Sequence, residues 1–182
     1  MSKIIAAINL TLDGMCDHTV ISPDEAIHDH YTALIDQADG ILYGRITYEL
    51  MKYWKPFITE PSGEPAMDNF ARAIDRIPKI VFSNTMQDTD WDSARLALRS
   101  LEETVKDLKQ QSGGEVLVGS RSLIASLTNL NLIDEYQLCI HPVITGKGLP
   151  LFDQIARRTV LKLITTKVFS SGAILSTYEP TD

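Results

Sequence analysis

Cysteine is scarce in this chain of 182 residues. Only Cys16 and Cys139 are present, and they stand far apart in the sequence. A disulfide framework or a zinc site of the Cys-x-x-Cys kind needs several cysteines at short, paired spacing. The sequence therefore predicts two ordinary thiols and no metal site.

Positive charge is also in short supply. The chain carries 17 Lys and Arg residues against 24 Asp and Glu residues, which gives a formal net charge of −7, and no basic run occurs. Nucleic-acid backbones are bound by clustered Lys and Arg side chains. A nucleic-acid partner is therefore not expected.

Long hydrophobic runs are absent as well. The apolar stretch within residues 1–12 alternates like a β-strand, and it is too short for a membrane span or the core of a signal peptide. We expect a cytoplasmic protein without membrane contact. A length of 182 residues with 44% hydrophobic residues suffices for one substantial core, so we predict a single domain over residues 1–182.

Segments of strand and helix length alternate along most of the chain, which is typical of an α/β fold. The predicted parallel strands are Lys3–Asn9, Gly40–Tyr43, Lys79–Phe82, Glu115–Val118 and Tyr136–Val143. Near the end, Thr159–Phe169 and Ala173–Tyr178 predict an antiparallel hairpin around Ser170-Ser171-Gly172. The sequence thus indicates a mostly parallel sheet with an antiparallel C-terminal edge.

Local motifs mark where helices begin and end. Ser22-Pro23-Asp24-Glu25 has the form of a capping box with Ser22 as N-cap, and Ser100-Leu101-Glu102-Glu103 has the same form. A further helix is expected over Ser120–Leu130, and the helix after Gly44 is expected to end at Pro56. The irregular segment Phe57–Ala66 is a candidate substrate-side loop.

Two strand-to-helix turns have the composition of phosphate sites. Gly44-Arg45-Ile46-Thr47 and Gly119-Ser120-Arg121-Ser122 each join a glycine to a guanidinium and a hydroxyl. Unpaired N–H groups at a helix N-terminus face an anion, and glycine lets the ligand approach the main chain. Either turn alone is also compatible with a plain turn and N-cap, but two at strand ends favour a dinucleotide. A standard Rossmann site is not supported, because no G-x-G-x-x-G occurs.

Five ordered segments together suggest a family. They are Ala6–Gly14, Leu42–Glu49, Val81–Thr85, Val116–Ser120 and Asp134–Phe152. In their order and their spread over nearly the whole chain they resemble the dihydrofolate reductase-like family, and within it the C-terminal reductase domain of bacterial riboflavin-biosynthesis proteins. The resemblance implies a three-layer α/β/α fold, NADPH as cofactor, a small-molecule substrate and a homodimer through the C-terminal sheet.

The same resemblance implies cofactor contacts at the strand ends. The implied contacts are Ala7 with the nicotinamide, Gly44, Arg45 and Thr47 with the phosphate-rich middle, Ser83 and Asn84 with the adenosine 2′-phosphate, and Gly119, Ser120 and Arg121 with the pyrophosphate. Hydroxyl, amide and guanidinium groups can bind phosphate oxygens without a metal. Ser83-Asn84-Thr85 also fits a plain turn after a strand, and Ser120 replaces the second glycine of the family's Gly-Gly pair.

Hydride transfer requires a proton for the other substrate atom. Asp13 is the candidate catalytic residue, since it matches the Asp of the family's S-L-D-G segment, although Asp-Gly is also a frequent turn pair. Asp24, Asp29, His28 and His30 lie on or near the first helix, where dihydrofolate reductases carry their substrate acid. Asp24 is equally explained as a partner of the helix dipole.

Three functions remain open. The first is an NADPH-dependent reductase that resembles 5-amino-6-(5-phosphoribosylamino)uracil reductase or acts on a related pterin. In such an enzyme Lys147, in Gly146-Lys147-Gly148, would bind a substrate phosphate, although the segment also fits a surface hairpin. The second is a catalytically silent nucleotide-binding or regulatory protein that keeps the fold. The third is a structural or partner-binding domain. The His-Glu-Cys-Cys signature of the family's accompanying deaminase is absent.

Overall fold

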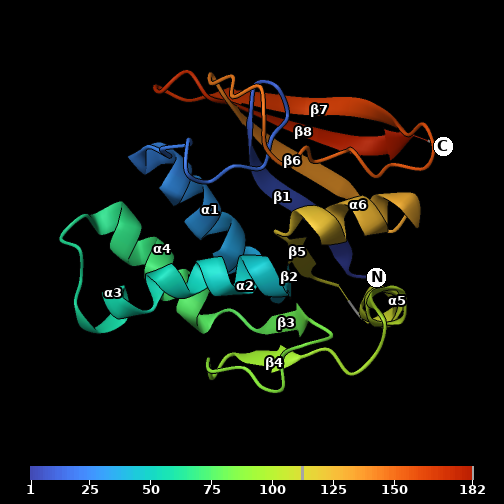
Figure 1. Cartoon of the computed structure of the whole chain (residues 1–182), viewed down its shortest axis with the longest axis horizontal. Helices are drawn as coiled ribbons and strands as arrows, with labels where there is room; N and C mark the ends of the chain where they lie inside the picture. The colour runs from blue at the N-terminus through green and yellow to red at the C-terminus, as the bar shows by residue number, and fades with distance from the viewer. Residues whose placement is uncertain (112, 182) are drawn as a thin grey trace.

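A mixed β-sheet forms the centre of the molecule, and the computed structural model describes residues 1–111 and 113–181. Its eight strands follow the order β4-β3-β2-β5-β1-β6-β8-β7 (Figure 1). The strands are β1 (Lys3–Thr11), β2 (Gly40–Gly44), β3 (Lys79–Phe82), β4 (Ala94–Leu96), β5 (Glu115–Val118), β6 (Glu135–His141), β7 (Val160–Val168) and β8 (Ile174–Thr181). Strands β1 to β6 pair in parallel, whereas β8 is antiparallel to both β6 and β7. The predicted parallel sheet with an antiparallel C-terminal hairpin is confirmed.

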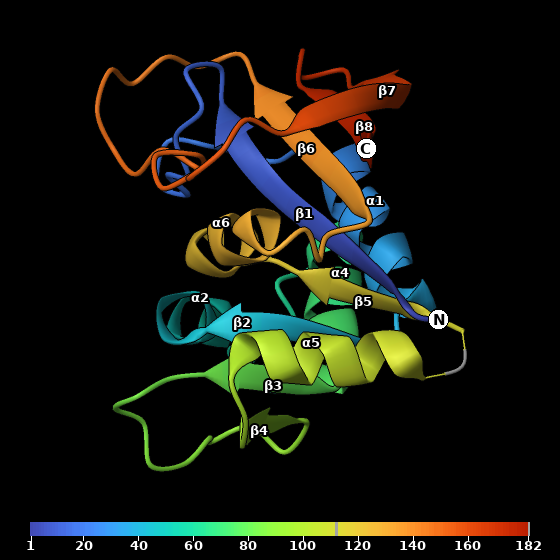
Figure 2. The same ribbon diagram turned by 90° about the vertical axis from the view of Figure 1, so that its right-hand side faces the viewer.

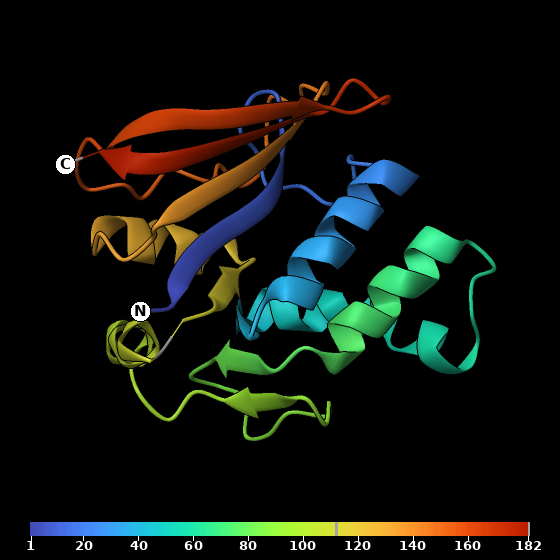
Figure 3. The same ribbon diagram turned by 180° about the vertical axis from the view of Figure 1, so that it is seen from behind.

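Helices cover both faces of the sheet, which confirms the predicted three layers. α5 (Leu101–Gln110) and α6 (Arg121–Asn129) lie in front of the sheet in Figure 2, and α1 (Glu25–Gln37) and α4 (Pro65–Arg76) lie behind it. Figure 3 shows α1 and α4 side by side. Between β2 and α4 the chain forms three short helical pieces, α2 (Arg45–Met51), the 3₁₀ turn η1 (Lys52–Trp54) and α3 (Pro56–Thr59).

Each face of the sheet has its own core, because successive side chains of a strand point to opposite faces. On β1, Ile4 and Ala6 join the core under α5 and α6, whereas Ile5 joins the core under α1 and α4. These side chains are at most 1% exposed, and burial of an Ile side chain contributes about 1.5–3 kcal/mol. The two cores therefore fix which strand residues face each helix layer.

The helix boundaries test the capping motifs. The Ser100 capping box is present as predicted. Ser22 was predicted as the N-cap of α1, and this is wrong: the N-cap is Asp24, whose Oδ1 accepts a hydrogen bond of 2.9 Å from Ile27 N. The other carboxylate oxygen of Asp24 accepts from Ser171 N at 3.2 Å, so the β7–β8 turn helps to select Asp24. Pro56 does not end the helical path but begins α3, since proline is tolerated at the first helical position.

Candidate functional site

The carboxyl ends of the parallel strands meet at one edge of the sheet, and a cleft of about 510 Å³ opens there beside β2 and β3. Its lining residues are Gly44, Arg45, Ile46, Thr47, Phe82, Ser83, Asn84, Thr85, Ala97, Arg99, Ser100, Leu101, Ser122 and Leu123. Ligands of open α/β sheets bind at this edge. Of the residues predicted to bind a cofactor, the structure brings five to this cleft: Gly44, Arg45, Thr47, Ser83 and Asn84.

The charge of this cleft is opposite to the charge of the chain. Arg45 and Arg99 line it, and no Asp or Glu is among its described lining residues, although the chain carries a net charge of −7. Arg99 also forms a solvent-exposed ion pair with Asp107, with 2.5 Å between Nη1 and Oδ2, and such pairs are weak and exchangeable. The cleft therefore favours an anionic ligand. Arg99 was missed because it lies in a loop with no motif beyond the capping box that follows.

Ser120 links the two predicted phosphate turns. Its side chain is buried, and its Oγ accepts a hydrogen bond of 2.8 Å from Gly44 N. For this reason Ser120, although it is the N-cap residue of α6, makes no side-chain cap. The N–H groups of the first turn of a helix have no intrahelical acceptor, and Ser122 and Leu123 of this turn line the cleft. The start of α6 thus offers uncapped donors and the positive end of the helix dipole to the cleft.

Gly119 lies in a closely packed position. A Cβ atom at this position would lie 3.1 Å from Cε1 of the buried Tyr43 ring. At Gly44, the corresponding contact would be 3.5 Å from Ser122 Oγ, which is an ordinary van der Waals distance. The absence of a side chain at Gly119 therefore allows the Tyr43 ring to pack closely against the end of β5.

The side chain of Arg121 points away from the cleft. Its Nε donates to Pro150 O at 2.8 Å, and its Nη2 lies 2.8 and 2.7 Å from the two carboxylate oxygens of Asp153. The guanidinium thus fastens the loop between β6 and β7 to the start of α6. The predicted pyrophosphate contact of Arg121 stays a prediction for its main-chain N–H.

Ser83 shapes the wall formed by the loop after β3. Its Oγ accepts hydrogen bonds from Thr85 N at 3.1 Å and from Met86 N at 3.0 Å. The turn that the sequence suggests is therefore present, and it leaves Asn84 and Thr85 exposed on the cleft wall. The turn and a ligand-binding role are compatible at this position.

Asp13 joins two loops at the same edge of the sheet. Its carboxylate accepts hydrogen bonds from Thr11 Oγ1 at 2.6 Å, Gly146 N at 2.7 Å and Thr145 N at 3.2 Å. These bonds, with the Thr11 hydroxyl as the largest cause, hold the pKa of Asp13 below its ordinary value. A carboxyl group that stays ionised is a poor proton donor at neutral pH. These contacts give Asp13 the role of an anchor, a residue that holds the loop after β1 and the loop after β6 together. Its catalytic role stays a prediction.

The loop after β1 and the loop after β6 form one unit around this anchor. Main-chain hydrogen bonds run from Leu12 N to Val143 O at 2.7 Å, from Cys16 N to Leu149 O at 2.9 Å and from Leu151 N to Gly14 O at 3.0 Å. Lys147 lies exposed in the second loop and is not among the lining residues of the cleft.

Both cysteines are free, and burial raises the pKa of Cys16 to about 11 and that of Cys139 to about 12.

A second polar region lies under α1, on the face of the sheet that carries Ala7. Beside Ala7, Gln137 of β6 is its register partner, and Gln137 Oε1 is 3.2 Å from His30 Nε2. Farther along the strands, His141 Nε2 is 2.9 Å from Asn9 Oδ1. Polar residues at alternate positions of otherwise apolar strands are the sequence signal that could have identified this region.

Two of the remaining candidates on or near α1, Asp24 and His28, make structural contacts. Asp24 caps the helix, and the His28 ring packs edge-on against Trp54 and Phe70 at centroid distances of 5.8 and 5.9 Å. Asp29 is exposed. The structure therefore does not gather these side chains into one acid site beside Ala7.

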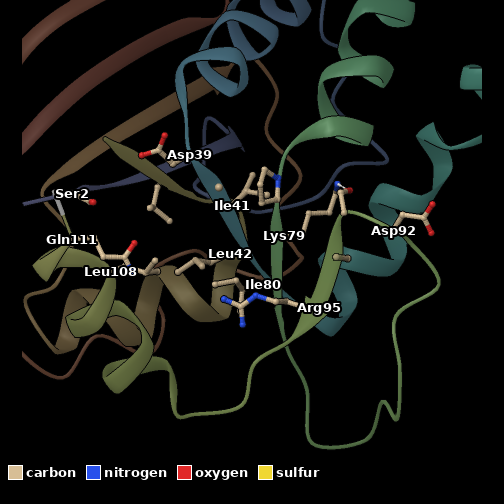
Figure 4. A pocket seen from close by; sticks show the side chains of 15 residues that line it. Ser2, Asp39, Ile41, Leu42, Lys79, Ile80, Asp92, Arg95, Leu108 and Gln111 are labelled. Atoms are coloured by element: carbon tan, nitrogen blue, oxygen red, sulfur yellow. Dashed lines mark hydrogen bonds between the residues drawn. The ribbon is translucent and has the colours of Figure 1, made fainter. Parts of the chain in front are cut away.

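A smaller pocket of about 260 Å³ lies at the opposite edge of the sheet. Figure 4 shows Asp39 and Asp92 on opposite sides of it, so the two carboxylates do not converge. The Lys79 ammonium is buried and donates to Ser93 Oγ at 2.6 Å and Ile77 O at 2.9 Å. Burial lowers the pKa of Lys79 to about 8. Because its hydrogen bonds are satisfied within the protein, Lys79 has a structural role.

Known proteins resemble this chain in sequence and in fold. The RibD C-terminal domain family matches residues 2–175. Protein YyaP of Bacillus subtilis (strain 168), itself uncharacterized, is 34% identical to this chain over an alignment 184 residues long. The alignment covers 97% of this chain and 94% of YyaP. A protein of Shewanella sp. PV-4 assigned to riboflavin biosynthesis has a TM-score of 0.73 at 22% identity, with both chains fully covered.

The reductase-containing protein of the riboflavin pathway shares the fold as well. A diaminohydroxyphosphoribosylaminopyrimidine deaminase/5-amino-6-(5-phosphoribosylamino)uracil reductase of Thermotoga maritima has a TM-score of 0.68 at 16% identity, covering 99% of this chain and 57% of that protein. No helix within the described residues is long and apolar enough to cross a bilayer. The match over residues 2–175 and the shared fold confirm the resemblance found in the sequence, and the chain belongs to the RibD C-terminal domain family.

Proposed function

We propose that this protein is an NADPH-dependent reductase that transfers a hydride to a C=N or C=O bond of a small heterocycle, such as the substrate of 5-amino-6-(5-phosphoribosylamino)uracil reductase or a related pterin. The observation that carries the proposal is the cationic cleft at the carboxyl edge of an acidic chain, with Arg45 and Arg99 on its walls and no described carboxylate. Such a cleft suits the phosphates of a dinucleotide.

The described residues fit NADPH by their donor chemistry. Arg45, Thr47 and the uncapped start of α6 would hold the phosphate-rich middle, because guanidinium, hydroxyl and main-chain N–H groups all donate to phosphate oxygens. Ser83 and Asn84, with Arg99 across the same cleft, would hold the 2′-phosphate. The nicotinamide, when bound, supplies the hydride, and Ala7 would lie beneath it on β1.

Asp13 would position the loops in this mechanism. Its hydrogen bonds to Thr145 and Gly146 hold the β6–β7 loop against the β1 loop, and an ionised Asp13 keeps that arrangement at neutral pH. None of the described lining residues of the cleft belongs to these loops, so Asp13 would act through the shape of this edge of the sheet. The proton for the substrate would then come from another group or from water.

A second candidate is a nucleotide-binding or regulatory protein without catalysis. It is favoured by the hydrogen bonds that the Asp13 carboxylate accepts from Thr11, Thr145 and Gly146, because a carboxylate bound in this way is a poor proton donor. This candidate predicts a bound dinucleotide and no hydride transfer, so one experiment separates it from the first.

Calorimetric titration with NADPH and NADH tests the proposal, followed by absorbance at 340 nm with aminopyrimidine and dihydropterin substrates. We expect NADPH to bind at least about tenfold more tightly than NADH, because the 2′-phosphate adds a charge-assisted contact. NADPH binding without oxidation by any substrate would favour the regulatory candidate. Failure of both dinucleotides to bind would reject the proposal.

We also propose a homodimer formed through the C-terminal hairpin. β7 is the last strand of the sheet, and Val160, Leu163, Ile164 and Val168 on it are 46–71% exposed. An exposed apolar edge strand is a surface for pairing. Sedimentation velocity should give a dimer that Leu163→Lys disrupts, whereas Leu98→Lys, at a 91% exposed position elsewhere, should not. A wild-type monomer would reject this proposal.

A further inference from the structure

The two arginines of the cationic cleft come from different places along the edge of the sheet. Arg45 follows β2 directly, and the start of α6 follows β5, the strand that pairs with β2. Arg99 lies in the loop after β4, on the far side of β3. Because neighbouring strands are about 4.8 Å apart, the ends of β2 and β4 are separated by about 10 Å. Arg45 therefore has the uncapped start of α6 beside it, whereas Arg99 is placed for a separate part of a ligand.

The helix that follows Arg99 already has its own cap. Ser100 Oγ accepts a hydrogen bond of 3.2 Å from Glu103 N, and Glu103 Oε2 accepts one of 3.1 Å from Ser100 N. This capping box satisfies N–H groups that would otherwise be open to an anion. A phosphate group at this end of the cleft would therefore depend on the Arg99 guanidinium, together with Ser83 and Asn84 from the loop after β3.

The Arg99 guanidinium is held by a carboxylate of α5. Its Nη1 lies 2.5 Å from Asp107 Oδ2. Ser100, Glu103 and Asp107 follow one another at spacings of three and four residues, which places them on one face of the helix. Ser100 lines the cleft, whereas Asp107 is not among its described lining residues and lies about 10 Å farther along the helix axis. The ion pair therefore holds the guanidinium along α5, at the margin of the cleft.

This ion pair is open to solvent and to exchange. The side chains of Arg99 and Asp107 are 63% and 51% exposed, and exposed ion pairs are weak and screened by salt. Arg99 also contributes to the lowered pKa of Glu103, after the hydrogen bonds from Ser100, so a second ionised carboxylate lies near it. A phosphate dianion offers a guanidinium two strong acceptors. A phosphate group that enters this end of the cleft can therefore displace Asp107.

We propose that Asp107 competes with the 2′-phosphate of NADPH for the Arg99 guanidinium, and thereby limits how strongly this protein prefers NADPH to NADH. This inference rests on the proposed reductase function and adds to it the residues that set the cofactor preference. In the free protein Arg99 is paired with Asp107, and in the NADPH complex it is paired with the 2′-phosphate. NADH has a hydroxyl group at this position, so it leaves the ion pair intact.

Calorimetric titration of Arg99→Gln, Asp107→Asn and the double variant with NADPH and NADH tests the proposal. Asp107→Asn should tighten NADPH binding about 2- to 5-fold, because a weak competing ion pair is removed, and it should leave NADH binding unchanged. Arg99→Gln should weaken NADPH binding about 10-fold and leave NADH binding unchanged. In the Arg99→Gln background, Asp107→Asn should change NADPH affinity by less than about 1.5-fold, because the contested group is gone.

Glu102→Gln is the matched control, since it removes the same charge from α5 at a carboxylate that pairs with Lys106 at 2.6 Å. It should bind both dinucleotides as the wild type does. The Tm of each variant should stay close to that of the wild type, because Arg99 and Asp107 are exposed. An equal gain in NADPH affinity in Glu102→Gln would show an effect of net charge and would overturn the competition.

The remaining outcomes separate this inference from the proposed function. Unchanged or weaker NADPH binding in Asp107→Asn would overturn the role of Asp107. Equal losses of NADPH and NADH affinity in Arg99→Gln would overturn the assignment of Arg99 to the 2′-phosphate and leave the dinucleotide site standing. A wild-type protein that binds neither dinucleotide would reject the proposed function and this inference together.

Discussion

At the Gly44 turn the arginine lines the cleft, whereas at the Gly119 turn the arginine turns away to Pro150 and Asp153. Both turns follow a strand and contain glycine, arginine and a hydroxyl residue. The difference arises from their neighbours, because the β6–β7 loop places a carboxylate and a carbonyl oxygen within reach of Arg121 only. Similar composition at two turns therefore does not give both arginine side chains the same direction.

The two turns are alike in the helix donors that follow them. Neither α2, which begins after Gly44, nor α6, which begins after Ser120, has a side-chain cap among the described residues, although the N–H of Gly44 itself is bound to Ser120 Oγ. The turns therefore differ in the direction of their arginine side chains and not in their uncapped N–H groups.

The largest expected effect is on cofactor affinity at the Gly44 turn. Arg45→Gln should weaken NADPH binding about 10- to 100-fold, because a charge-assisted bond to phosphate is lost. Arg121→Gln should weaken it less than about 3-fold, because its guanidinium is paired elsewhere. Calorimetric titration of both variants checks the contrast, and equal losses would break the distinction between the turns. Arg45 is exposed, so the Tm of Arg45→Gln should match that of the wild type.

Ser120→Ala should give the next largest effect, on stability. Without the hydroxyl, Gly44 N–H loses its acceptor, and the free energy of unfolding should fall by about 1–3 kcal/mol. Urea unfolding followed by circular dichroism checks this expectation. Ser122→Ala, one residue into α6 and exposed, is the control and should change stability by less than about 0.5 kcal/mol. A fully stable Ser120→Ala would mean that the link between the turns is dispensable.

Arg121→Gln should lower stability by about 0.5–1 kcal/mol, a value kept small because the Arg121 and Asp153 side chains remain 20% and 37% exposed. A double-mutant cycle with Asp153→Asn isolates the ion pair, since the second change should add little once the first is made. Additive losses would contradict the assignment of Arg121 to the loop.

The smallest effect concerns Asp13 and pH. Its pKa is lowered in the folded protein, so the carboxylate adds stability above its unfolded pKa, and this contribution is lost as pH falls through the lowered folded pKa. Asp13→Asn should therefore be less thermostable than wild type near pH 7, and the two should converge in acid. A Tm difference that is constant with pH would show that the charge of Asp13 has no part in holding the loops.

Much of the fold could be predicted from the sequence, because burial in a sheet leaves long apolar strands and because capping residues are local. Lys79–Phe82 and Glu115–Val118 were predicted to the residue. β4 was missed, since a strand of three residues with alternating exposure leaves no periodicity to detect. The N-cap of α1 was misplaced by two residues because Ser22 and Asp24 are both good caps, and the choice is made by the distant Ser171.

The site was less predictable, because its pieces depend on side-chain direction. Arg45, Ser83 and Asn84 could be placed at strand ends from order alone, and they meet in one cleft. The direction of Arg121 depends on Asp153, which lies 32 residues away in sequence.

The contact between Gly119 and the Tyr43 ring bears on how relatives of this protein should be compared. A side chain at position 119 would meet the ring at 3.1 Å whether or not a ligand is present. Selection for close packing alone would then favour this glycine, whether or not a chain of this family binds a cofactor. Conservation of Gly119 among relatives would accordingly indicate only a fold shared by descent. Conservation of an arginine at position 45, which the fold does not need, would indicate that this residue serves a function.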